Sequence, residues 1–573
     1  MKNKTITIDN NVYPIENEKN LLEAIRAAGI DLPTFCYQPE LSVFGACRMC
    51  MVEVEGRGLV PACSTAVMDG MVVRTNTKQI RDMRKMIVEL MLAHHDQNCT
   101  TCPKSGSCKL QSLAHKMGIS KVRFQDVETE ITIDMSSKSI VRNSSKCVLC
   151  GCCVRTCREI QSVGALDFAN RGSDAKIVSN FDKPIGKVEC VNCGQCIKVC
   201  PVGALSPKYQ INEVWNEIYN EDKTVVVQIA PAVRVAIGEQ FGYEPGEATT
   251  GQMVSALRMM GFDYIYDTSF GADFTVIEEG NEFIERFKKG EKLPQFTSCC
   301  PAWVKFAEQT YPELLPNVST CSSPQQMFGA LCKDQLTKML NIPREKLVVV
   351  SIMPCTAKKF EAARPEFAKD GNPDVDYVLT TQELAMMIQE RGIDFRGLEI
   401  GSFDMPFGFK TGAAVIFGTT GGVSEAVLRY AAYNLSGGQM PNVKELRGKE
   451  GIKTLEVTLG EVTLRLAVVS GLANARKLIE AIKAGKESYD LIEVMACCGG
   501  CVNGGGQPIS KTSDTVENRA EGLYKNDKDL QFHSSEQNPY LQKMYKEDID
   551  KEKAHHLFHT GYQERQYVTI DED

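Results

Sequence analysis

The 24 cysteines of this 573-residue chain constrain its fold and chemistry more than any other feature of the sequence. A disulfide scaffold rich in cysteine is normally short and secreted, whereas a chain of this length must contain several domains. Residues 1–9 alternate like a β-strand and lack the apolar core of a signal peptide. We therefore expect a reducing, cytoplasmic environment in which the cysteines bind metal. An export signal on a partner subunit is the alternative that remains open.

The overall composition excludes two other classes of protein. The hydrophobic fraction of 43% is ordinary for a globular protein. A net charge of −8 argues against nucleic acid as a partner. No run of 18 apolar residues occurs, so the sequence predicts no membrane span.

Eight of the cysteines form an internal repeat. The pattern Cys-x2-Cys-x2-Cys-x3-Cys begins at Cys147 and again at Cys190, where Pro201 follows the last cysteine. It resembles the bacterial two-cluster ferredoxins, in which the fourth cysteine of each run binds the other cluster. The expected 4Fe–4S sites are Cys147, Cys150, Cys153 with Cys200, and Cys190, Cys193, Cys196 with Cys157. Cys152 breaks the spacing and is expected to be a packed thiol.

An earlier group of four cysteines predicts a 2Fe–2S site. Its members are Cys36, Cys47, Cys50 and Cys63. Strand-like segments at 51–55 and 59–61 flank a turn, and residues 20–28 read as a short helix. A β-grasp domain with one 2Fe–2S cluster fits this pattern. The alternative is a structural zinc site.

A histidine precedes the next three cysteines. The set is His95, Cys99, Cys102 and Cys108, and it suits a 4Fe–4S cluster with one nitrogen ligand. Segment 80–92 has helical spacing and presents the histidine at its end. The adjacent His94 is the alternative ligand.

Alternating strands and helices follow from about residue 225. Buried-strand runs lie at 225–230, 347–352, 466–469 and 491–494, and helical periodicity at 252–260, 324–340 and 381–391. This order predicts an α/β architecture with ligands at the carboxyl ends of the strands. Three segments there place cysteine beside small or rigid residues, at 297–303, 353–359 and 493–506.

The three segments together resemble the signature segments of the FeFe-hydrogenases, and the resemblance covers essentially the whole chain. It implies an enzyme that reversibly converts protons and electrons to H2 at an H-cluster, a 4Fe–4S cubane with a two-iron subsite bearing CO, CN and an azadithiolate bridge. It implies a multidomain α+β and α/β fold that ends in two α/β lobes. The expected domains are 1–79 for the 2Fe–2S cluster, 80–125 for the His/Cys3 4Fe–4S cluster, 138–209 for two 4Fe–4S clusters and 210–573 for catalysis.

The resemblance also implies the residues around the H-cluster. The cubane ligands would be Cys300, Cys355, Cys497 and Cys501, with Cys501 bridging to the two-iron subsite. Lys358 would donate to a cyanide ligand, the alternative being a solvated surface lysine. The residues enclosing the subsite would be Ala230, Pro231, Pro324, Gln325, Met353, Phe417 and Met495. Ala232 departs from the serine frequent in relatives, so one hydroxyl contact to cyanide would be missing.

A proton relay is implied by the same resemblance. Cys299, beside a cubane ligand, would pass protons through Glu279, Ser319 and Glu282 to Arg286 near the surface. Without the resemblance, Glu282 and Arg286 would be an ordinary i,i+4 surface pair.

Several questions stay open. Electrons would be exchanged with ferredoxin or with flavin- and NAD(P)-binding subunits of a complex, and maturation factors would supply the cofactor. An electron-conducting subunit without chemistry, and an iron–sulfur assembly scaffold or gas sensor, are the competing functions. Cys321, Cys332 and Cys498 receive no role. The last 60 residues, in which 538–546 read as helical, would wrap the catalytic domain or meet a partner.

Overall fold

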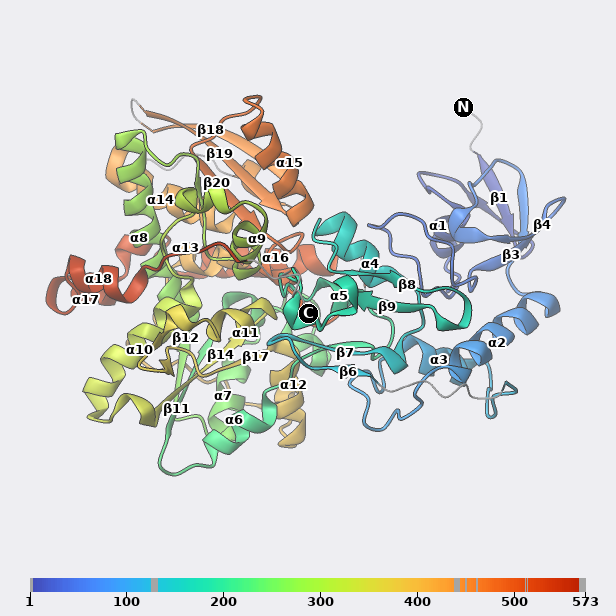
Figure 1. The fold of residues 1–573 in the computed structure, drawn as a ribbon, viewed down its shortest axis with the longest axis horizontal. Helices are drawn as coiled ribbons and strands as arrows, with labels where there is room; N and C mark the ends of the chain where they lie inside the picture. The colour runs from blue at the N-terminus through green and yellow to red at the C-terminus, as the bar shows by residue number, and fades with distance from the viewer. Residues whose placement is uncertain are drawn as a thin grey trace, which may run out of the picture.

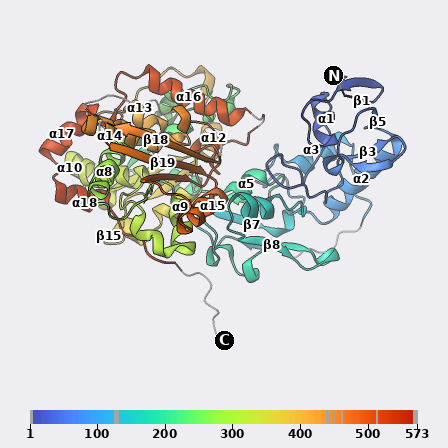
Figure 2. The same ribbon diagram turned by 90° about the horizontal axis from the view of Figure 1, so that it is seen from above.

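The computed structural model consists of a body and an arm (Figure 1). It describes residues 4–124, 132–436, 444–448, 451–459, 462–510, 512 and 514–565. The arm holds the N-terminal cysteine-rich modules, and the body holds the α/β part. Figure 2 shows the arm extending from one side of the body when the molecule is seen from above. Among the described helices, none has the length and apolar character needed to cross a membrane.

The first module has the expected β-grasp form. Its five-stranded sheet has the order β2-β1-β5-β3-β4. The strands are β1 (Thr5–Ile8), β2 (Asn11–Pro14), β3 (Met51–Val54), β4 (Gly58–Pro61) and β5 (Met71–Arg74). Helix α1 (Leu21–Ala27) begins after Asn20, whose side chain accepts a hydrogen bond from the Glu23 amide at 3.1 Å. The expected helix and hairpin are thus confirmed.

The second and third modules are built mainly of loops that carry cysteines. Their helices are α2 (Lys78–Ala93), α3 (Lys109–Lys116), α4 (Cys152–Arg155) and α5 (Gln195–Val199). Their strands are β6 (Ile133–Asp134), β7 (Ile140–Asn143), β8 (Leu166–Ala169), β9 (Lys176–Ser179) and β10 (Leu205–Pro207). Helix α4 continues as a π-helix over Thr156–Ile160, an irregularity that the sequence analysis did not anticipate.

Two sheets form the core of the body. The first is parallel, with the order β12-β11-β14-β17, and contains β11 (Thr224–Ile229), β12 (Tyr264–Asp267), β14 (Leu347–Met353) and β17 (Tyr377–Thr380). The second has the order β13-β20-β19-β18 and contains β13 (Gln295–Phe296), β18 (Ile452–Leu459), β19 (Val462–Ser470) and β20 (Leu491–Met495). Only β18 runs antiparallel in it. A small hairpin joins β15 (Ala368–Lys369) to β16 (Asn372–Pro373).

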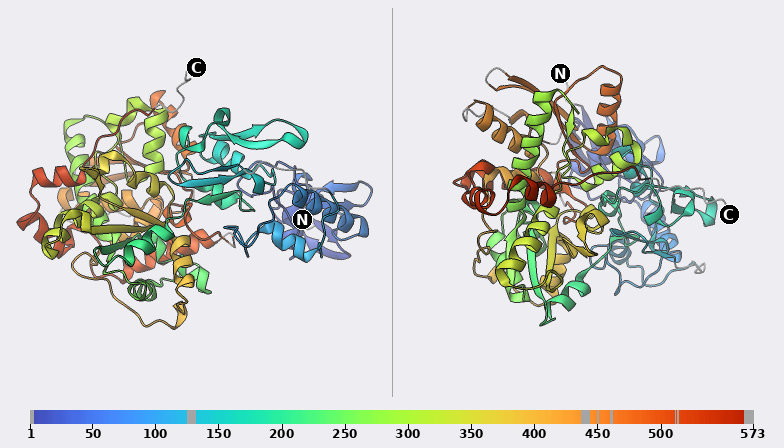
Figure 3. Two further views of the ribbon diagram at one scale, coloured as in Figure 1. Left: turned by 60° about the horizontal axis from the view of Figure 1, so that its bottom comes forward. Right: turned by 60° about the vertical axis from the view of Figure 1, so that its left-hand side comes forward.

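Helices cover both sheets, as Figure 3 shows from two sides. They are α6 (Ile211–Ile218), α7 (Thr250–Met260), α8 (Thr268–Lys289), α9 (Pro301–Thr310), α10 (Pro324–Leu340), α11 (Ala357–Ala362), α12 (Thr381–Glu390), α13 (Gly412–Val415), α14 (Gly422–Ser436) and α15 (Leu472–Lys483). The three helices expected near 252–260, 324–340 and 381–391 correspond to α7, α10 and α12. The strands expected in the body are likewise present.

The described part of the C-terminal tail wraps the body. It contains α16 (Thr515–Asp529), α17 (Pro539–Glu547) and α18 (Lys551–Phe558). Buried Arg519 on α16 pairs with Glu239 at 2.6 Å, and Asn538 donates to Asp273 at 3.0 Å. Helix α18 packs against α10. The expected helix at 538–546 is therefore present as α17.

Candidate active site

A buried cavity lies where the carboxyl ends of the two body sheets face each other. Its volume is about 80 Å³, and its wall is almost wholly apolar. Segments that follow β11, β14 and β20 line it, which is where parallel sheets usually present ligand groups. It gathers fourteen side chains singled out from the sequence: Cys299, Cys300, Cys355, Cys497, Cys501, Lys358, Ala230, Pro231, Ala232, Pro324, Gln325, Met353, Phe417 and Met495.

The backbone reaches the cavity closely because one wall segment is rich in glycine. Gly500 has φ of +92°, and a Cβ built on it would lie 2.6 Å from the amide nitrogen of Thr420. Gly504 has an ordinary φ, but its Cβ would lie 2.1 Å from the Pro354 carbonyl oxygen. Both contacts are with backbone atoms, which cannot rotate away. A side chain at either position would displace the segment that carries Cys497 and Cys501.

Replacing Gly500 by alanine should therefore weaken binding of the iron–sulfur cluster that the sequence resemblance implies for this cavity more than it unfolds the protein. The strained φ and the clash with Thr420 each destabilise the native loop by about 1 kcal/mol or more. Iron content and thermal unfolding of the variant measure the two effects. Gly485, which also has positive φ but has open space around its Cβ, provides the control as Gly485→Ala. Equal iron loss in both variants would contradict this account.

Lys358 is held at the cavity rather than on the surface. It lies in the first turn of α11, and its Nζ donates to the Cys299 carbonyl oxygen at 3.2 Å and to Glu361 at 2.9 Å. Burial alone would lower the pKa of this ammonium, but the Glu361 carboxylate outweighs burial and holds the pKa above its usual value. The side chain is thus a charged donor at the wall of the cavity, and the alternative of a solvated lysine is wrong.

The five residues of the expected proton relay lie in one region, although only Cys299 lines the cavity. Glu279 is fully buried on α8, and neither carboxyl oxygen has a hydrogen-bond partner among the residues described. Burial and the nearby Glu282 carboxylate raise the pKa of Glu279 to about 8, against the influence of Ser319. Ser319 Oγ donates to Glu282 at 2.7 Å, and Arg286 donates to Glu282 at 2.5 Å.

Electrostatic interaction couples Cys299 and Glu279, the inner two residues of this group. Burial, and next the negative charge of Glu279, raise the pKa of the Cys299 thiol well above its usual value. At neutral pH both Cys299 and Glu279 are therefore mostly protonated. Glu282 has 13% of its side chain exposed. The series thus runs from the cavity wall to the protein surface.

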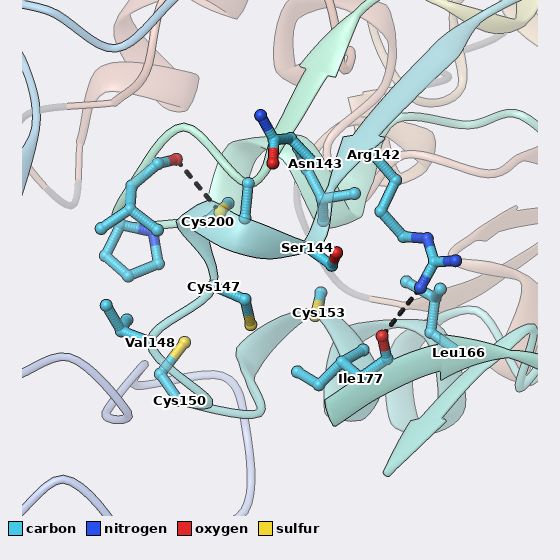
Figure 4. A pocket seen from close by; sticks show the side chains of 14 residues that line it. Arg142, Asn143, Ser144, Cys147, Val148, Cys150, Cys153, Leu166, Ile177 and Cys200 are labelled. Atoms are coloured by element: carbon cyan, nitrogen blue, oxygen red, sulfur yellow. Dashed lines mark hydrogen bonds between the residues drawn. The ribbon is translucent and has the colours of Figure 1, made fainter. Parts of the chain in front are cut away.

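A second and a third cavity lie in the ferredoxin-like module. Cys147, Cys150, Cys153 and Cys200 line one of about 30 Å³, and their sulfurs converge in Figure 4. Cys157, Cys190, Cys193 and Cys196 line the other, of about 20 Å³. The structure therefore brings together the crossed sets expected from the repeat. Cys152 lines neither cavity; its thiol is fully buried and donates to the Phe35 carbonyl oxygen at 3.4 Å.

The ferredoxin-like module adjoins the cavity of the body directly. Gln195, next to Cys196 on α5, donates through Nε2 to the Cys497 thiol at 3.0 Å. Thr356, next to Cys355, donates to the Asn192 carbonyl oxygen at 2.8 Å. Residues beside the Cys157/Cys190 set thus contact residues of the body cavity, without an intervening layer of side chains.

The four cysteines of the first module are all buried. The Cys36 and Cys47 sulfurs lie 3.4 Å apart. The Cys50 and Cys63 thiols interact, which lowers the pKa of Cys50 to about 7. Cys36 also adjoins the ferredoxin-like module, because the Arg155 guanidinium donates to its carbonyl oxygen.

His95 and His94 differ sharply in their surroundings. Burial and the nearby Lys146 lower the pKa of His95 to about 4, against the opposing influence of Asp96, so its imidazole is neutral. Its Nδ1 is buried and has no hydrogen-bond partner within the described structure. His94, in contrast, lines a wide open cleft. Cys102 and Cys108 follow on the loop before α3, and a Cβ on Gly203 would lie 2.4 Å from the Cys102 sulfur.

The structure adds residues that the sequence analysis missed. Glu361 fixes Lys358, and its i+3 spacing from Lys358 was an available signal. Glu493 is fully buried, and burial raises its pKa to about 7 although it accepts hydrogen bonds from the Gly421 and Ser424 amides. Thr268 also lines the cavity. No local pattern marks Glu493 or Thr268, because their roles depend on how distant segments meet.

The donor set of the body cavity fits an iron–sulfur centre with a further polar group attached. Four thiols converge there, as a cubane requires. Beyond them, the wall offers the Lys358 ammonium and the buried Gln325 Oε1, which has no hydrogen-bond partner among described residues. Both are suited to a polar group beside the thiols.

Comparison with known families agrees with this arrangement along the chain. Residues 223–505 match the iron only hydrogenase large subunit, C-terminal domain, and residues 513–565 match the iron hydrogenase small subunit. Residues 2–78 match a 2Fe-2S iron-sulfur cluster binding domain. Residues 84–123 match the NADH-ubiquinone oxidoreductase-G iron-sulfur binding region, and 137–206 match the ferredoxin-like domain of NADH-quinone oxidoreductase subunit 3.

Individual relatives match over nearly the full length. The NADP-reducing hydrogenase subunit HndD of Solidesulfovibrio fructosivorans is 45% identical, covering 98% of this chain and 99% of that protein. Iron hydrogenase 1 of Clostridium pasteurianum is 38% identical, covering 98% and 100%. A solved structure of FeFe-hydrogenase HydA1 from Chlamydomonas reinhardtii is 39% identical with a TM-score of 0.57, covering 62% of this chain and 98% of the other. The chain therefore belongs to the FeFe-hydrogenases, as a large subunit with 2Fe–2S and 4Fe–4S binding domains, and is an iron hydrogenase that catalyses the production and oxidation of H2.

Proposed function

We propose that the body cavity holds an H-cluster whose cubane is bound by Cys300, Cys355, Cys497 and Cys501. The observation that carries this proposal is that one buried cavity collects these four thiols together with Cys299 and Lys358. Production of H2 by the matured protein with a chemical reductant tests it, alongside quantification of iron. The proposal requires both to be lost when Cys355 becomes alanine. H2 production by an iron-depleted Cys355→Ala protein would contradict it.

When bound, the H-cluster supplies the two-electron chemistry that interconverts protons and H2. Lys358 presents a charged donor to an anionic group at the cavity wall, held there by Glu361. Ala230, Pro231, Pro324, Phe417, Met353 and Met495 exclude water from the site, and Gln325 adds an amide to its wall. Ala232 has no hydroxyl group, so the contact to cyanide that a serine would make at this position is absent.

Protons reach the cavity through side chains of this chain. Cys299 exchanges a proton at Sγ with the reacting group on one side and with Glu279 on the other. Glu279 has a pKa near the operating pH, which is favourable for a general acid and base. Ser319 and Glu282 continue the route, and Arg286 holds the Glu282 carboxylate near the surface. The direct hydrogen bonds of the outer residues and the electrostatic coupling of the inner ones support this order.

Electrons reach the same cavity through four accessory clusters in this proposal. One 2Fe–2S cluster lies in 1–79, one His-ligated 4Fe–4S cluster in 80–125, and two 4Fe–4S clusters in 138–209. The cluster on Cys147, Cys150, Cys153 and Cys200 forms a branch point, because Cys152 and Lys104 connect its surroundings to both earlier modules. The cluster on Cys157, Cys190, Cys193 and Cys196 adjoins the body cavity through Gln195. The catalytic domain then occupies 210–573.

His95, rather than His94, is the proposed ligand of the second cluster. His95→Ala should lose up to about a third of the accessory 4Fe–4S signal, since one of three such clusters loses a ligand. His94→Ala should keep all of it, because that side chain lines an open cleft. Iron quantification and electron paramagnetic resonance of the reduced proteins measure this difference. Cluster loss in the His94 variant with retention in the His95 variant would reverse the assignment.

We further propose that this chain works in the cytoplasm as part of an NADP-linked complex, with ferredoxin as a second electron partner. The similarity to HndD supports the complex. Flavin and nicotinamide would be bound by partner subunits, and maturation factors would install the two-iron part of the H-cluster. Affinity purification of the tagged chain from its native cells, followed by an assay for H2-dependent NADP reduction, tests this. Purification as a single chain that reduces only ferredoxin would favour the stand-alone alternative.

A further inference from the structure

We propose that Glu282, Cys321 and His559 form a binding site for a borderline divalent cation such as Zn²⁺, and that a cation bound there closes the proton route. The existence of the site rests on the contacts described below. Its blocking effect rests on the proposed relay, in which Glu282 is a member.

The three side chains come from separate parts of the chain and converge on one point. Glu282 lies on α8, Cys321 precedes α10, and His559 follows α18; these helices lie side by side in Figure 1. One ligand atom from each residue lies within 4.8 Å of the other two. Carboxylate oxygen, thiolate sulfur and imidazole nitrogen are the ligands that zinc takes in proteins.

The backbone fixes two of the three positions. Cys321 and His559 face each other in an antiparallel β-bridge. On either side of it, the Ser322 amide donates to the Phe558 carbonyl oxygen, and the Thr560 amide donates to the Thr320 carbonyl oxygen, both at 2.7 Å. The C-terminal tail is thereby held against the segment before α10. The ligands do not depend on mobile side chains to meet.

The three ligand atoms would have to move closer together around a cation. Cys321 Sγ lies 3.8 Å from Glu282 Oε2 and 4.0 Å from His559 Nδ1. In a tetrahedral zinc site, bonds of about 2.0 Å to nitrogen or oxygen and about 2.3 Å to sulfur separate the ligand atoms by roughly 3.3–3.6 Å. A shift of about half an ångström brings the sulfur to that spacing, and the Glu282 and His559 ligand atoms, which lie within 4.8 Å of each other, approach by at most about 1.5 Å through side-chain rotation.

His559 has the outer partner typical of a metal-binding imidazole. Its Nε2 faces Glu278 Oε2 at 3.3 Å, and the Tyr545 hydroxyl donates to the same carboxylate. A carboxylate on one ring nitrogen directs the other nitrogen to a metal. In His559 the other ring nitrogen is Nδ1, which lies toward Cys321. Nδ1 and Thr320 Oγ1 share a hydrogen bond of 2.8 Å. Thr320 would release this bond when the cation binds.

The charges around the site favour a cation. Two carboxylates, Glu278 and Glu282, face it, and Cys321 adds a third negative charge when its proton is displaced. Arg286 offers one compensating positive charge, through its pair with Glu282. A cation on Glu282 Oε2, with Arg286 on Oε1, would withdraw negative charge from this carboxylate and make it a poor acceptor for the proton that Ser319 relays.

X-ray absorption spectroscopy at the zinc edge tests the site itself. The sample is the iron-loaded protein after addition of one equivalent of Zn²⁺. We expect one sulfur at about 2.3 Å and nitrogen or oxygen ligands at about 2.0–2.1 Å. Cys321→Ser should remove the sulfur contribution while keeping the volume of the side chain. Absence of sulfur would indicate surface carboxylates or imidazoles, and several sulfurs would indicate cluster cysteines; either result overturns the site. This readout does not require hydrogenase activity.

Zinc titration of H2 production, with dithionite-reduced viologen as the electron donor, tests the blocking effect. We expect reversible inhibition, relieved by a chelator, with a midpoint at least about tenfold higher in Cys321→Ser and in His559→Gln. Cys332→Ser and His556→Gln replace a buried cysteine and an exposed histidine away from the site and should match the wild type. Equal inhibition of wild type and Cys321→Ser, or zinc binding without inhibition, would overturn the blocking effect. A protein that binds zinc as expected but never produces H2 would instead refute the proposed function.

Discussion

Replacing Cys299 by serine should lower the rate of H2 production by about 10²–10⁴-fold, the range in which general acid–base groups contribute. The thiol lines the cavity and is the first proton-exchanging group beside it. A serine hydroxyl has nearly the same size but is a much weaker acid than a thiol, so it gives up and regains the proton far less readily. Steady-state H2 production with a chemical donor measures the effect.

The control for this prediction separates proton transfer from cofactor assembly. Cys332 is fully buried in the apolar core of the body and does not line the cavity, so Cys332→Ser should keep most of the activity. The Cys299→Ser protein should keep its full iron content, because Cys299 is not among the four proposed ligands. Normal turnover in this variant would refute the relay, and loss of iron would show that Cys299 supports the cluster instead.

Replacing Glu279 by glutamine should also lower H2 production by about 10²-fold or more, yet leave the protein at least as stable near neutral pH. Burial raises the pKa of this carboxyl from its ordinary 4.5 to about 8. The folded protein therefore binds the proton more tightly than the unfolded chain does. Glutamine keeps the shape of the protonated side chain but cannot transfer a proton. Activity and thermal unfolding of the same preparation measure both effects.

The raised pKa of Glu279 also predicts how the free energy of unfolding changes with pH. The contribution of Glu279 to the free energy of unfolding is complete below pH 4.5 and is lost as the pH rises toward about 8. Between these values the wild type should lose stability relative to Glu279→Gln, with a slope of at most about 1.4 kcal/mol per pH unit. Glu285, an exposed residue on the same helix, provides the control as Glu285→Gln. A parallel pH dependence of Glu279→Gln and wild type would show that this carboxyl is not buried as described.

Short-range patterns carried most of the fold prediction. The cysteine spacing from Cys147 to Cys200 specified which thiols meet, because the ferredoxin pattern already encodes the crossing of the fourth cysteine. Strand and helix periodicity located β11, β14 and α10 within one or two residues. The π-helix after α4 was not predicted, because one extra residue per turn does not change the hydrophobic spacing recognisably.

The site was predictable where function resides in a contiguous segment, and less so where it depends on packing. Cys355 and Lys358 lie in one motif, and the structure places both at the cavity. Glu493 and Cys321 acquire their surroundings from segments far away in the sequence, so neither could be interpreted from local pattern. Cys321 in particular meets His559 only because the C-terminal tail folds back over the body.

An infrared spectrum of the anaerobically matured protein, recorded under H2 and then under argon, tests the central claim most directly. The account predicts carbonyl and cyanide bands that shift between the two gases, because a cluster on Cys300, Cys355, Cys497 and Cys501 would change state with its substrate. Bands that stay fixed would contradict turnover through the relay. Absence of bands in protein matured alongside an active hydrogenase control would contradict the presence of the H-cluster itself.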